Sequence, residues 1–261
     1  MKLVDSHCHL DDEQFDQDRE QTIERARAAG IDTLMAIGTG HGPPGLEAAI
    51  RLADRYPFVY ATVGVHPHDA AKASDDTFAR LRDLARHPKV RALGEIGLDY
   101  HYDFSPREVQ RSVFEKQLDL AAEARLPVVI HTREAWDDTL AILGAHWRGG
   151  GIMHCFTGDE QQAWQALERG FHLAFGGVLT FPKAESVRQA ARITPEDRLL
   201  VETDCPYLAP VPMRGKRNEP AFLVETVRRL AEVRGVTPET IAGLTTANFE
   251  QLCLRGAAPS G

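Results

Sequence analysis

The sequence predicts an α/β protein, a single (β/α)8 TIM barrel over residues 1–255 with an extra helix at its C-terminal end. Three observations predict this fold. Short apolar, β-branched runs alternate with amphipathic runs, eight such units fit a barrel of roughly 250 residues, and no linker-like stretch divides the chain. A hydrophobic content of 43% allows a sizeable core, and residues 256–261 are expected to form a flexible tail.

The expected strands are short apolar runs, namely Leu3–Asp5, Thr33–Ile37, Val59–Val65, Ala92–Ile96, Val128–His131, Ile152–His154, His172–Phe175 and Leu199–Glu202. The expected helices include Glu13–Ala29, Pro106–Ala124, Ala135–His146, Gln161–Arg169, Glu185–Ile193, Pro220–Arg234 and Pro238–Arg255. Gly30 and Gly170 are helix stop signals. Strands separated by helical crossovers predict a parallel sheet. An open doubly wound sheet is the alternative, but it needs a Gly-rich turn where this chain has Ser6-His7-Cys8-His9.

Charge and hydropathy restrict the partners. The formal net charge of −8 repels polyphosphate, so any contact with nucleic acid must be local, through a basic loop or bound metal. No apolar run reaches the roughly 18 residues of a membrane span, and the N-terminus enters a strand pattern without the apolar stretch of a signal peptide. We therefore expect a cytoplasmic, soluble protein with no membrane partner and no obligate protein partner.

Polar residues interrupt the apolar strands at their C-terminal ends. His7 and His9 end the first strand on one face, and a lone His-x-His is a weak signal that two core histidines would explain equally well. Further candidates end later strands, namely Glu95, His131 and His154, and Asp204 follows the eighth strand. Active sites of barrels form at these strand ends, and burying so many ionisable groups is costly unless a cation compensates them. The pattern predicts a metal centre.

Six ligands exceed the three or four protein groups that one catalytic ion takes, so we expect two divalent cations roughly 3.5–4 Å apart. Glu95 would bridge them, with His7, His9 and Asp204 on one ion and His131 and His154 on the other. Mixed N/O ligands suit Mg²⁺, Mn²⁺ or Zn²⁺. Three of the four cysteines directly follow a predicted ligand, and we expect all four thiols to be small buried hydrophobes.

Three segments resemble the motifs of the TatD family of metal-dependent deoxyribonucleases: Asp5-Ser6-His7-Cys8-His9-Leu10-Asp11, Pro127-Val128-Val129-Ile130-His131-Thr132-Arg133-Glu134 and Leu199-Leu200-Val201-Glu202-Thr203-Asp204-Cys205-Pro206. Shorter matches are Gly64-Val65-His66-Pro67-His68, His154-Cys155-Phe156-Thr157-Gly158 and Arg214-Gly215-Lys216-Arg217-Asn218-Glu219-Pro220. The resemblance runs from about residue 3 to the last helix. It implies a TIM-barrel hydrolase of the amidohydrolase superfamily with nuclease activity on DNA, often exonucleolytic, and the same six ligands.

The expected reaction is hydrolysis of a phosphodiester by a metal-bridged hydroxide. The metals and nearby cationic side chains would stabilise the charge that develops on the phosphoryl oxygens. Asp204, beside both metal and water, is the candidate general base, and Glu95 is the second catalytic carboxylate. Single-stranded or frayed DNA ends are the expected substrate.

Several residues are candidates for substrate contact. His66 ends the third strand, where it could bind phosphate or orient a ligand, or be a structural histidine. Glu202 lies two residues before Asp204 and could hold a ligand imidazole. Arg133 could clamp a phosphate, although a surface ion pair is the alternative.

A basic loop follows the eighth strand, the phosphate-facing region of such barrels. Its cations could contact substrate or belong to a solvated turn, and they are Arg214, Lys216 and Arg217. Three aromatic residues after the Glu95 strand could stack on bases or pack against the rim, and they are Tyr100, Tyr102 and Phe104.

Two other functions remain open. The same scaffold and metal chemistry serve amidohydrolases, lactonases and phosphotriesterases that act on small molecules; many of these bridge their metals with a carboxylated lysine on the fourth strand, where this chain has Glu95. A non-catalytic binding role is the other alternative, and the complete ligand set argues against it.

Overall fold

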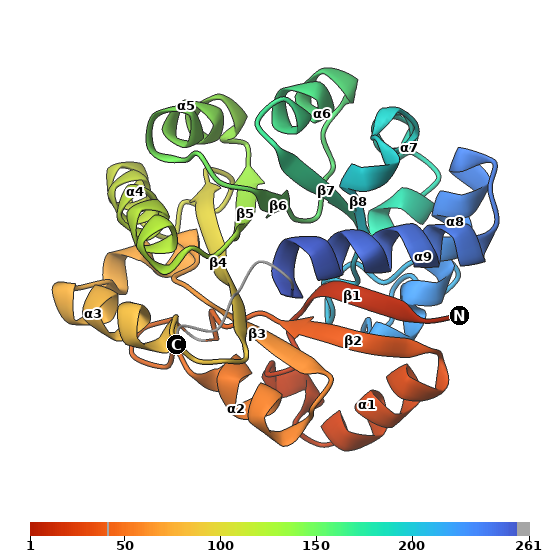
Figure 1. Cartoon of the computed structure of the whole chain (residues 1–261), viewed down its shortest axis with the longest axis horizontal. Helices are drawn as coiled ribbons and strands as arrows, with labels where there is room; N and C mark the ends of the chain where they lie inside the picture. Colours follow the sequence, from red (N-terminus) through yellow and green to blue (C-terminus); the bar gives the residue numbers. More distant parts are fainter. Residues whose placement is uncertain (41, 255–261) are drawn as a thin grey trace. The chain divides into compact units, whose positions relative to one another are not determined.

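The computed structural model describes residues 1–40 and 42–254 (Figure 1). Within them, eight strands alternate with helices and pair in parallel, which confirms the (β/α)8 class that the sequence predicts. The strands are β1 Leu3–Cys8, β2 Ile31–Ala36, β3 Val59–Val63, β4 Val90–Asp99, β5 Val128–Arg133, β6 Gly151–Met153, β7 Phe171–Phe175 and β8 Leu199–Val201. The helices are α1 Arg19–Ala28, α2 Ala48–Arg55, α3 Asp75–Leu84, α4 Arg107–Ala124, α5 Trp136–His146, α6 Glu160–Leu167, α7 Glu185–Ile193, α8 Leu223–Arg234 and α9 Pro238–Phe249. The expected tail, residues 256–261, lies outside the described residues.

The chain packs as two compact units. The first comprises residues 1–36 and 153–251, and the second comprises residues 37–152 and, among the described residues, 252–254. Each unit has its own strands and covering helices, and each is described by itself. That residues 1–255 form a single domain stays a prediction.

In the first unit, two parallel strand pairs meet at β1 and β8. Strand β1 pairs with β2, and β7 pairs with β8. The ends of β1 and β8 are joined by main-chain hydrogen bonds: the Asp204 N–H donates to the His7 carbonyl (2.9 Å), and the His9 N–H donates to the Cys205 carbonyl (2.8 Å). Helix α9 packs on β1 and β8, and α6 packs on β7 (Figure 1). The segments around His7 and Asp204, almost 200 residues apart in sequence, therefore lie side by side.

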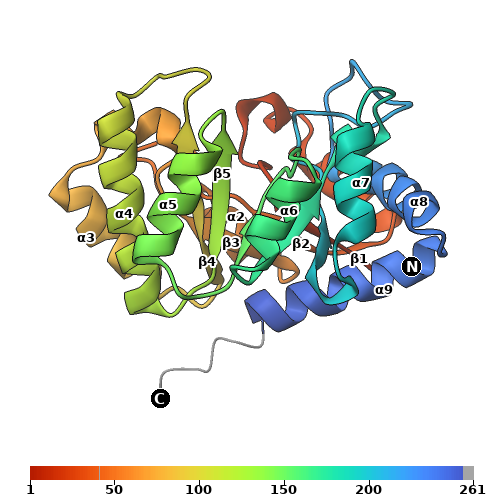
Figure 2. The same ribbon diagram turned by 90° about the horizontal axis from the view of Figure 1, so that it is seen from above.

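In the second unit, β4 pairs in parallel with β3 on one side and with β5 on the other. Helices α2, α4 and α5 pack on β3, β4 and β5 in turn (Figure 2). Strand β4 approaches β5 so closely that a Cβ atom on Gly97 would lie 1.9 Å from the His131 carbonyl oxygen, and Gly97 has a φ of 142°. Only glycine fits there, and its place brings the ends of β4 and β5 together.

The strands are short because their apolar runs are short, and both faces are covered. Every residue of β1, β7 and β8 is buried, as parallel strands between helices require. Gly30 (φ 94°) and Gly170 (φ 80°) adopt the left-handed conformation just beyond α1 and α6, which confirms both stop signals. The expected first helix was wrong at its start, because residues Glu13–Phe15 form a separate 3-10 turn capped by Asp12.

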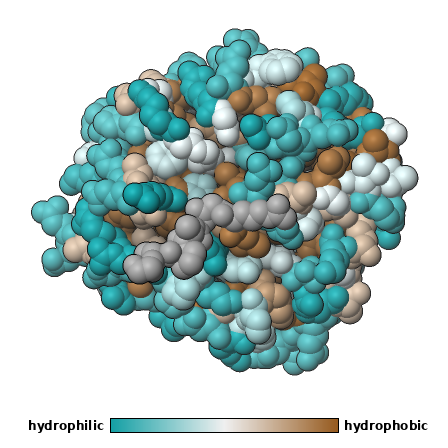
Figure 3. Space-filling view, in the orientation of Figure 1, coloured by the Kyte–Doolittle hydropathy of each residue, from teal (hydrophilic) through white to brown (hydrophobic). Residues whose placement is uncertain are grey.

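Cys8, Cys205 and Cys253 are buried free thiols, as expected, whereas Cys155 is half-buried. The Cys8 Sγ donates to the Met35 carbonyl (3.3 Å), so it points at β2. Hydrophilic residues cover much of the face drawn in Figure 3, with smaller apolar groups between them. Across residues 1–40 and 42–254, no helix combines the length and apolarity that a bilayer crossing requires.

Candidate metal centre

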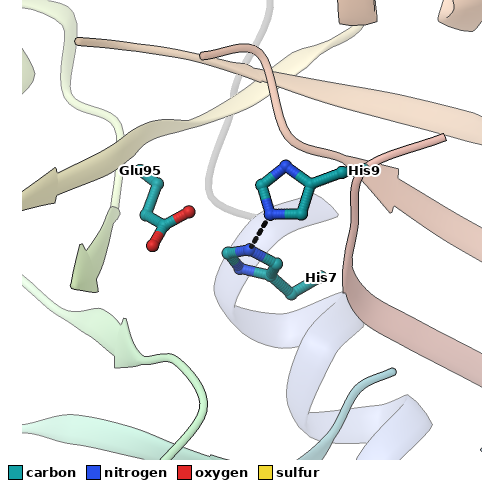
Figure 4. A group of neighbouring side chains, drawn as sticks. All are labelled: His7, His9 and Glu95. Atoms are coloured by element: carbon teal, nitrogen blue, oxygen red, sulfur yellow. Dashed lines mark hydrogen bonds between the residues drawn. The ribbon is translucent and has the colours of Figure 1, made fainter. Parts of the chain in front are cut away.

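Three side chains converge where β1 and β8 end. The Nε2 atoms of His7 and His9 lie 3.2 Å apart (Figure 4). Asp204 Oδ1 lies 3.6 Å from His7 Nε2 and 3.4 Å from His9 Nε2. His7 is fully buried and Asp204 is 8% exposed. The three side chains thus bring two imidazole nitrogens and a carboxylate oxygen together in a largely buried site. This is a typical ligand set for a divalent cation.

The Asp5 carboxyl group links the end of β1 to the turn before Asp204. Its Oδ1 accepts from the Thr203 N–H (2.9 Å) and the His7 N–H (3.3 Å), and its Oδ2 accepts from the Thr203 hydroxyl (2.5 Å). Burial raises the pKa of Asp5 to about 7, against the hydrogen bonds that lower it. One carboxyl group thus fixes the turn before Asp204 relative to the end of β1.

His154 and Glu202 form a second group beside His7. The rings of His7 and His154 are stacked with centroids 3.9 Å apart, and His154 Nδ1 lies 3.4 Å from Glu202 Oε1. One nitrogen or oxygen from each of His7, His154 and Glu202 lies within 4.8 Å of the others. Glu202 Oε1 also accepts from the Cys155 N–H, while Oε2 is buried and accepts no hydrogen bond from any described residue.

The carboxylates of this unit differ in their electrostatics. Burial raises the pKa of Glu202 to about 7, although His154 lowers it. Burial also acts to raise the pKa of Asp204, but the hydrogen bond from His9 and the nearby imidazoles hold it below its ordinary value. This unit buries imidazoles and carboxylates, and Glu202 Oε2 has no donor among the described residues. Such a group fits a bound divalent cation, because the cation compensates the burial of charged groups.

The second unit holds its own group, with His66 beyond the end of β3, Glu95 in the middle of β4 and His131 in the second half of β5. His131 Nδ1 lies 2.7 Å from Glu95 Oε1, and His66 Nε2 lies 3.5 Å from the same oxygen. One donor atom from each of the three lies within 4.8 Å of the others. Burial lowers the pKa of His66 to about 4, although Glu95 raises it. His66 is therefore neutral at physiological pH, with ring nitrogens suited to a metal or a hydrogen bond.

Asp99 completes this group, and sequence reasoning did not assign it a role. Its Oδ2 accepts from His68 Nε2 (2.9 Å) and His131 Nε2 (3.0 Å). Burial acts to raise the pKa of Asp99, but the hydrogen bonds from His131 and His68 dominate and hold it well below its usual range. Because the Asp99 carboxylate accepts the hydrogen bond from His131 Nε2, the His131 Nδ1 atom beside Glu95 is able to bind metal. The available signal was the spacing: Asp99 follows Glu95 by four residues in a strand that continues to Asp99.

The predicted ligands are thus brought together in two groups within the units. His7, His9, His154 and Asp204 gather in the first unit, and Glu95 and His131 in the second. His154 lies against His7 and Glu202; the sequence pattern indicates that Glu202 could hold a ligand imidazole, but not which one. How these ligands divide between ions stays a prediction.

The predicted substrate residues have varied surroundings. Arg133 is exposed, with its guanidinium 4.8 Å from the centre of the Tyr102 ring. Lys216 is exposed, and the Arg214 guanidinium lies 4.2 Å from the centre of the Phe181 ring. Arg217 instead pairs with Asp18 through two hydrogen bonds of 2.7 Å. Their contact with substrate stays a prediction.

A (β/α)8 chain whose strand ends carry histidines and carboxylates in metal-binding groups falls in the class of metal-dependent hydrolases. The family of TatD related DNases matches residues 4–253, and the chain belongs to this family. The resemblance seen in the sequence motifs is confirmed, and the protein is a hydrolase that depends on metal.

Relatives of known name span almost the full chain. YabD of Bacillus subtilis, named as an uncharacterized metal-dependent hydrolase, is 43% identical over 96% of this chain and 98% of its own length. The 3'-5' ssDNA/RNA exonuclease TatD of Cronobacter sakazakii is 40% identical over 99% of this chain and 100% of its own. The crystal structure of YjjV, a TatD homologue from Escherichia coli K12, matches with a TM-score of 0.90 at 32% identity, covering 96% of this chain and 97% of that one.

Proposed function

We propose that this protein is a divalent-metal-dependent nuclease that hydrolyses phosphodiester bonds of DNA, working from an end. The observation that carries the proposal is the convergence of His7 Nε2, His9 Nε2 and Asp204 Oδ1 within 3.2–3.6 Å of one another in a buried place. Relatives at 40% identity named as exonucleases of single-stranded DNA and RNA support the substrate class.

The proposed ligand set is the one that the sequence predicts. In a barrel the C-terminal ends of the strands meet at one face, so Glu95 and His131 are proposed to act together with the ligands of the first unit. Glu95 is proposed to be shared by two cations, Mg²⁺, Mn²⁺ or Zn²⁺. The contact of His131 with both Glu95 and Asp99 supports a metal-binding orientation of its ring.

When bound, divalent cations supply a water of lowered pKa and positive charge near the phosphoryl oxygens. Asp204 is ionised at neutral pH because its pKa is held below the ordinary value, and it is proposed to accept the proton of the attacking water. Glu202 is proposed to orient the His154 imidazole, from which its Oε1 lies 3.4 Å. His66, Arg133, Arg214, Lys216 and Arg217 remain the proposed contacts to the phosphate backbone.

The test is release of mononucleotides from an end-labelled oligonucleotide. The purified full chain is stripped with chelator and reloaded separately with Mg²⁺, Mn²⁺ or Zn²⁺, and single-stranded DNA, duplex DNA and RNA are offered in parallel. We expect metal-dependent release with single strands cleaved fastest. Asp204→Asn should keep bound metal and lose most turnover, by about 100-fold or more.

The matched control is His146→Ala, which removes a histidine near the end of α5 whose side chain is 37% exposed. This variant should cleave as the unchanged protein does, and circular dichroism should show that both variants are folded. Full activity of Asp204→Asn would rule out its assigned role. Hydrolysis of a lactone or a small phosphotriester, with every oligonucleotide left intact under all three metals, would replace the nuclease assignment by the small-molecule alternative.

A further inference from the structure

Two large aromatic side chains stand exposed just beyond β4. Tyr102 is 48% exposed and Phe104 is 67% exposed. A surface phenylalanine by itself needs no explanation, but two exposed rings held in a defined arrangement beside proposed metal ligands are unusual and point to a binding role.

The two rings form a layered stack with an arginine. Their planes are inclined by only 14° and their centroids are 5.2 Å apart, which is an offset stack. The Arg133 guanidinium lies 4.8 Å from the centre of the Tyr102 ring. Phe104 is the more exposed of the two rings, so a planar group of a ligand could stack on it.

The turn that carries the rings is rigid. Asp99 Oδ1 accepts from the backbone N–H groups of His101 (3.0 Å) and Tyr102 (2.9 Å). Asp103, between the two aromatic residues, has a φ of 51°, and Arg107 binds its carboxylate through hydrogen bonds of 2.8–3.3 Å. Asp103 thus adopts the left-handed conformation between the two aromatic residues whose rings stack.

Buried side chains hold both ends of this turn. Gln110 accepts from the Asp99 N–H (2.8 Å) and donates to the carbonyls of Asp99 (3.0 Å) and Ser105 (2.8 Å). The Ser105 hydroxyl donates to the His68 carbonyl (2.8 Å). The Tyr102 and Phe104 rings are therefore held in position before a ligand binds, so little conformational entropy is lost on binding.

The stack is joined directly to the group around Glu95. Asp99, which fixes the backbone of Tyr102, also accepts from His131 Nε2. The His68 ring meets the Phe104 ring at 77°, with centroids 4.9 Å apart, and the His66 ring lies 4.2 Å from the His68 ring. A flat group on Phe104 would therefore lie beside the residues proposed to handle the phosphodiester.

Tyr100, the third aromatic residue of this segment, has a different role. Its hydroxyl donates to Asp138 (2.7 Å) and accepts from Arg111 (3.0 Å), and the Arg107 guanidinium lies 4.3 Å from its ring centre. These contacts tie the turn to α4 and α5. Of the three aromatic residues, only Tyr102 and Phe104 are exposed.

We propose that Tyr102 and Phe104 form a stacking platform for an unpaired base near the end of a nucleic-acid strand. The inference rests on the proposed nuclease function and assigns the substrate form: a single strand or a frayed end, because stacked neighbours cover both faces of a base inside a duplex. Every base has a π-face, so the platform accepts any sequence. Arg133 adds a positive charge suited to the adjoining phosphate.

Binding is measured with 2-aminopurine, whose fluorescence is quenched by stacking, placed at each of the last three positions of either end in turn. The metal-loaded full chain is titrated into oligonucleotides with phosphorothioate end linkages, which slow hydrolysis. We expect quenching at one or more end positions. Phe104→Ala should abolish it and weaken binding by about 5- to 150-fold, the range measured for base–aromatic stacking.

Three further variants separate stacking from packing. Phe104→Trp keeps an aromatic face and should keep the quenching, whereas Phe104→Leu keeps an apolar group and should lose it. Trp164→Ala removes another exposed aromatic residue (48% exposed) from α6 and should change neither binding nor quenching.

Cleavage gives a second measurement. An abasic residue at the quenched position should raise the KM of the unchanged protein by a similar factor and leave the KM of Phe104→Ala unchanged. If the unchanged protein cleaves oligonucleotides but Phe104→Ala binds, quenches and cleaves equally well, the platform is refuted while the nuclease function stands. If the unchanged protein neither binds nor cleaves any oligonucleotide, the proposed function fails and the platform with it.

Discussion

Replacing Arg217 with alanine should destabilise the folded protein measurably. Arg217 lies in the loop after β8, and its guanidinium makes two hydrogen bonds of 2.7 Å to the carboxylate of Asp18, just before α1. It also donates to the Gln14 carbonyl (2.5 Å) and lies 4.5 Å from the centre of the Phe15 ring. One side chain therefore ties this loop to the segment that leads into α1.

The expected size follows from these contacts. A hydrogen bond to a charged group contributes about 1.5–3 kcal/mol when sheltered. The side chains of Arg217 and Asp18 are 28% and 34% exposed, so solvent screening reduces the value of the pair. With the contact to Phe15, the loss should be about 2 kcal/mol, which corresponds to a fall in Tm of about 4–8 °C for a chain of this size.

The loss should depend on pH. The hydrogen bonds from Arg217 hold the pKa of Asp18 well below its usual range, despite burial, which acts in the opposite direction. A carboxylate whose pKa is lowered on folding stabilises the protein at pH values above its unfolded pKa, about 3.9, and this stabilisation is lost as the pH falls through the folded value. The difference between the two proteins should be full at pH 7 and shrink below about pH 4.

The assay is urea unfolding at pH 7, 5 and 3, with Arg228→Ala as the matched control. Arg228 is 61% exposed and pairs with Glu225 on the same helix, so its loss should change the free energy of unfolding by less than about 0.5 kcal/mol. Equal stabilities of Arg217→Ala and the unchanged protein at pH 7 would refute the reasoning. So would a loss that is the same at all three pH values.

Three other changes have defined outcomes. Gln110→Met removes three buried hydrogen bonds and should lower the free energy of unfolding by about 3 kcal/mol, measured by urea unfolding; an unchanged midpoint would contradict the rigid turn. Replacing Arg214 and Lys216 together with alanine should weaken DNA binding and reduce its salt dependence, measured as Kd against salt concentration; identical slopes would exclude both from phosphate contact. Removing metal with chelator should lower Tm, and adding metal again should restore it. A metal concentration 100 times Kd should raise the free energy of unfolding by about 2.7 kcal/mol; a Tm that does not respond to metal would argue against bound metal in the folded protein.

The fold was largely predictable because its two sequence signals, apolar runs and the glycines that end helices, are local. Apolar runs bounded by glycines such as Gly30 and Gly170 placed the strands and helices to within a few residues. Boundaries were missed where a capping side chain or the pairing with a neighbouring strand decides them. Asp12 caps a separate turn within the expected first helix, and β4 continues to Asp99 because β5 pairs with it along that length.

The site was predictable only in part. The residues that could be predicted are polar interruptions of apolar strands. His7, His9 and Asp204 were recognised by that pattern, and the structure places them together. Asp99 and Asp5 act through hydrogen bonds to residues distant in sequence. The spacing of Asp99 from Glu95 indicates a shared strand face, but no local pattern identifies His131 or Thr203 as the partners. The roles of Tyr100 and Tyr102 also depend on tertiary contacts: the Tyr100 hydroxyl bonds to side chains of α4 and α5, whereas the Tyr102 ring is exposed.

The most direct test of the central claim is an anomalous diffraction measurement on crystals of the full chain grown with Mn²⁺ or Zn²⁺. The account predicts two peaks, one of them roughly 2.0–2.2 Å from nitrogens of His7 and His9 and from an oxygen of Asp204. A second peak should lie at a similar distance from His131 and from Glu95, which is predicted to touch both ions. A map with no anomalous density near His7 and Asp204 would contradict the account.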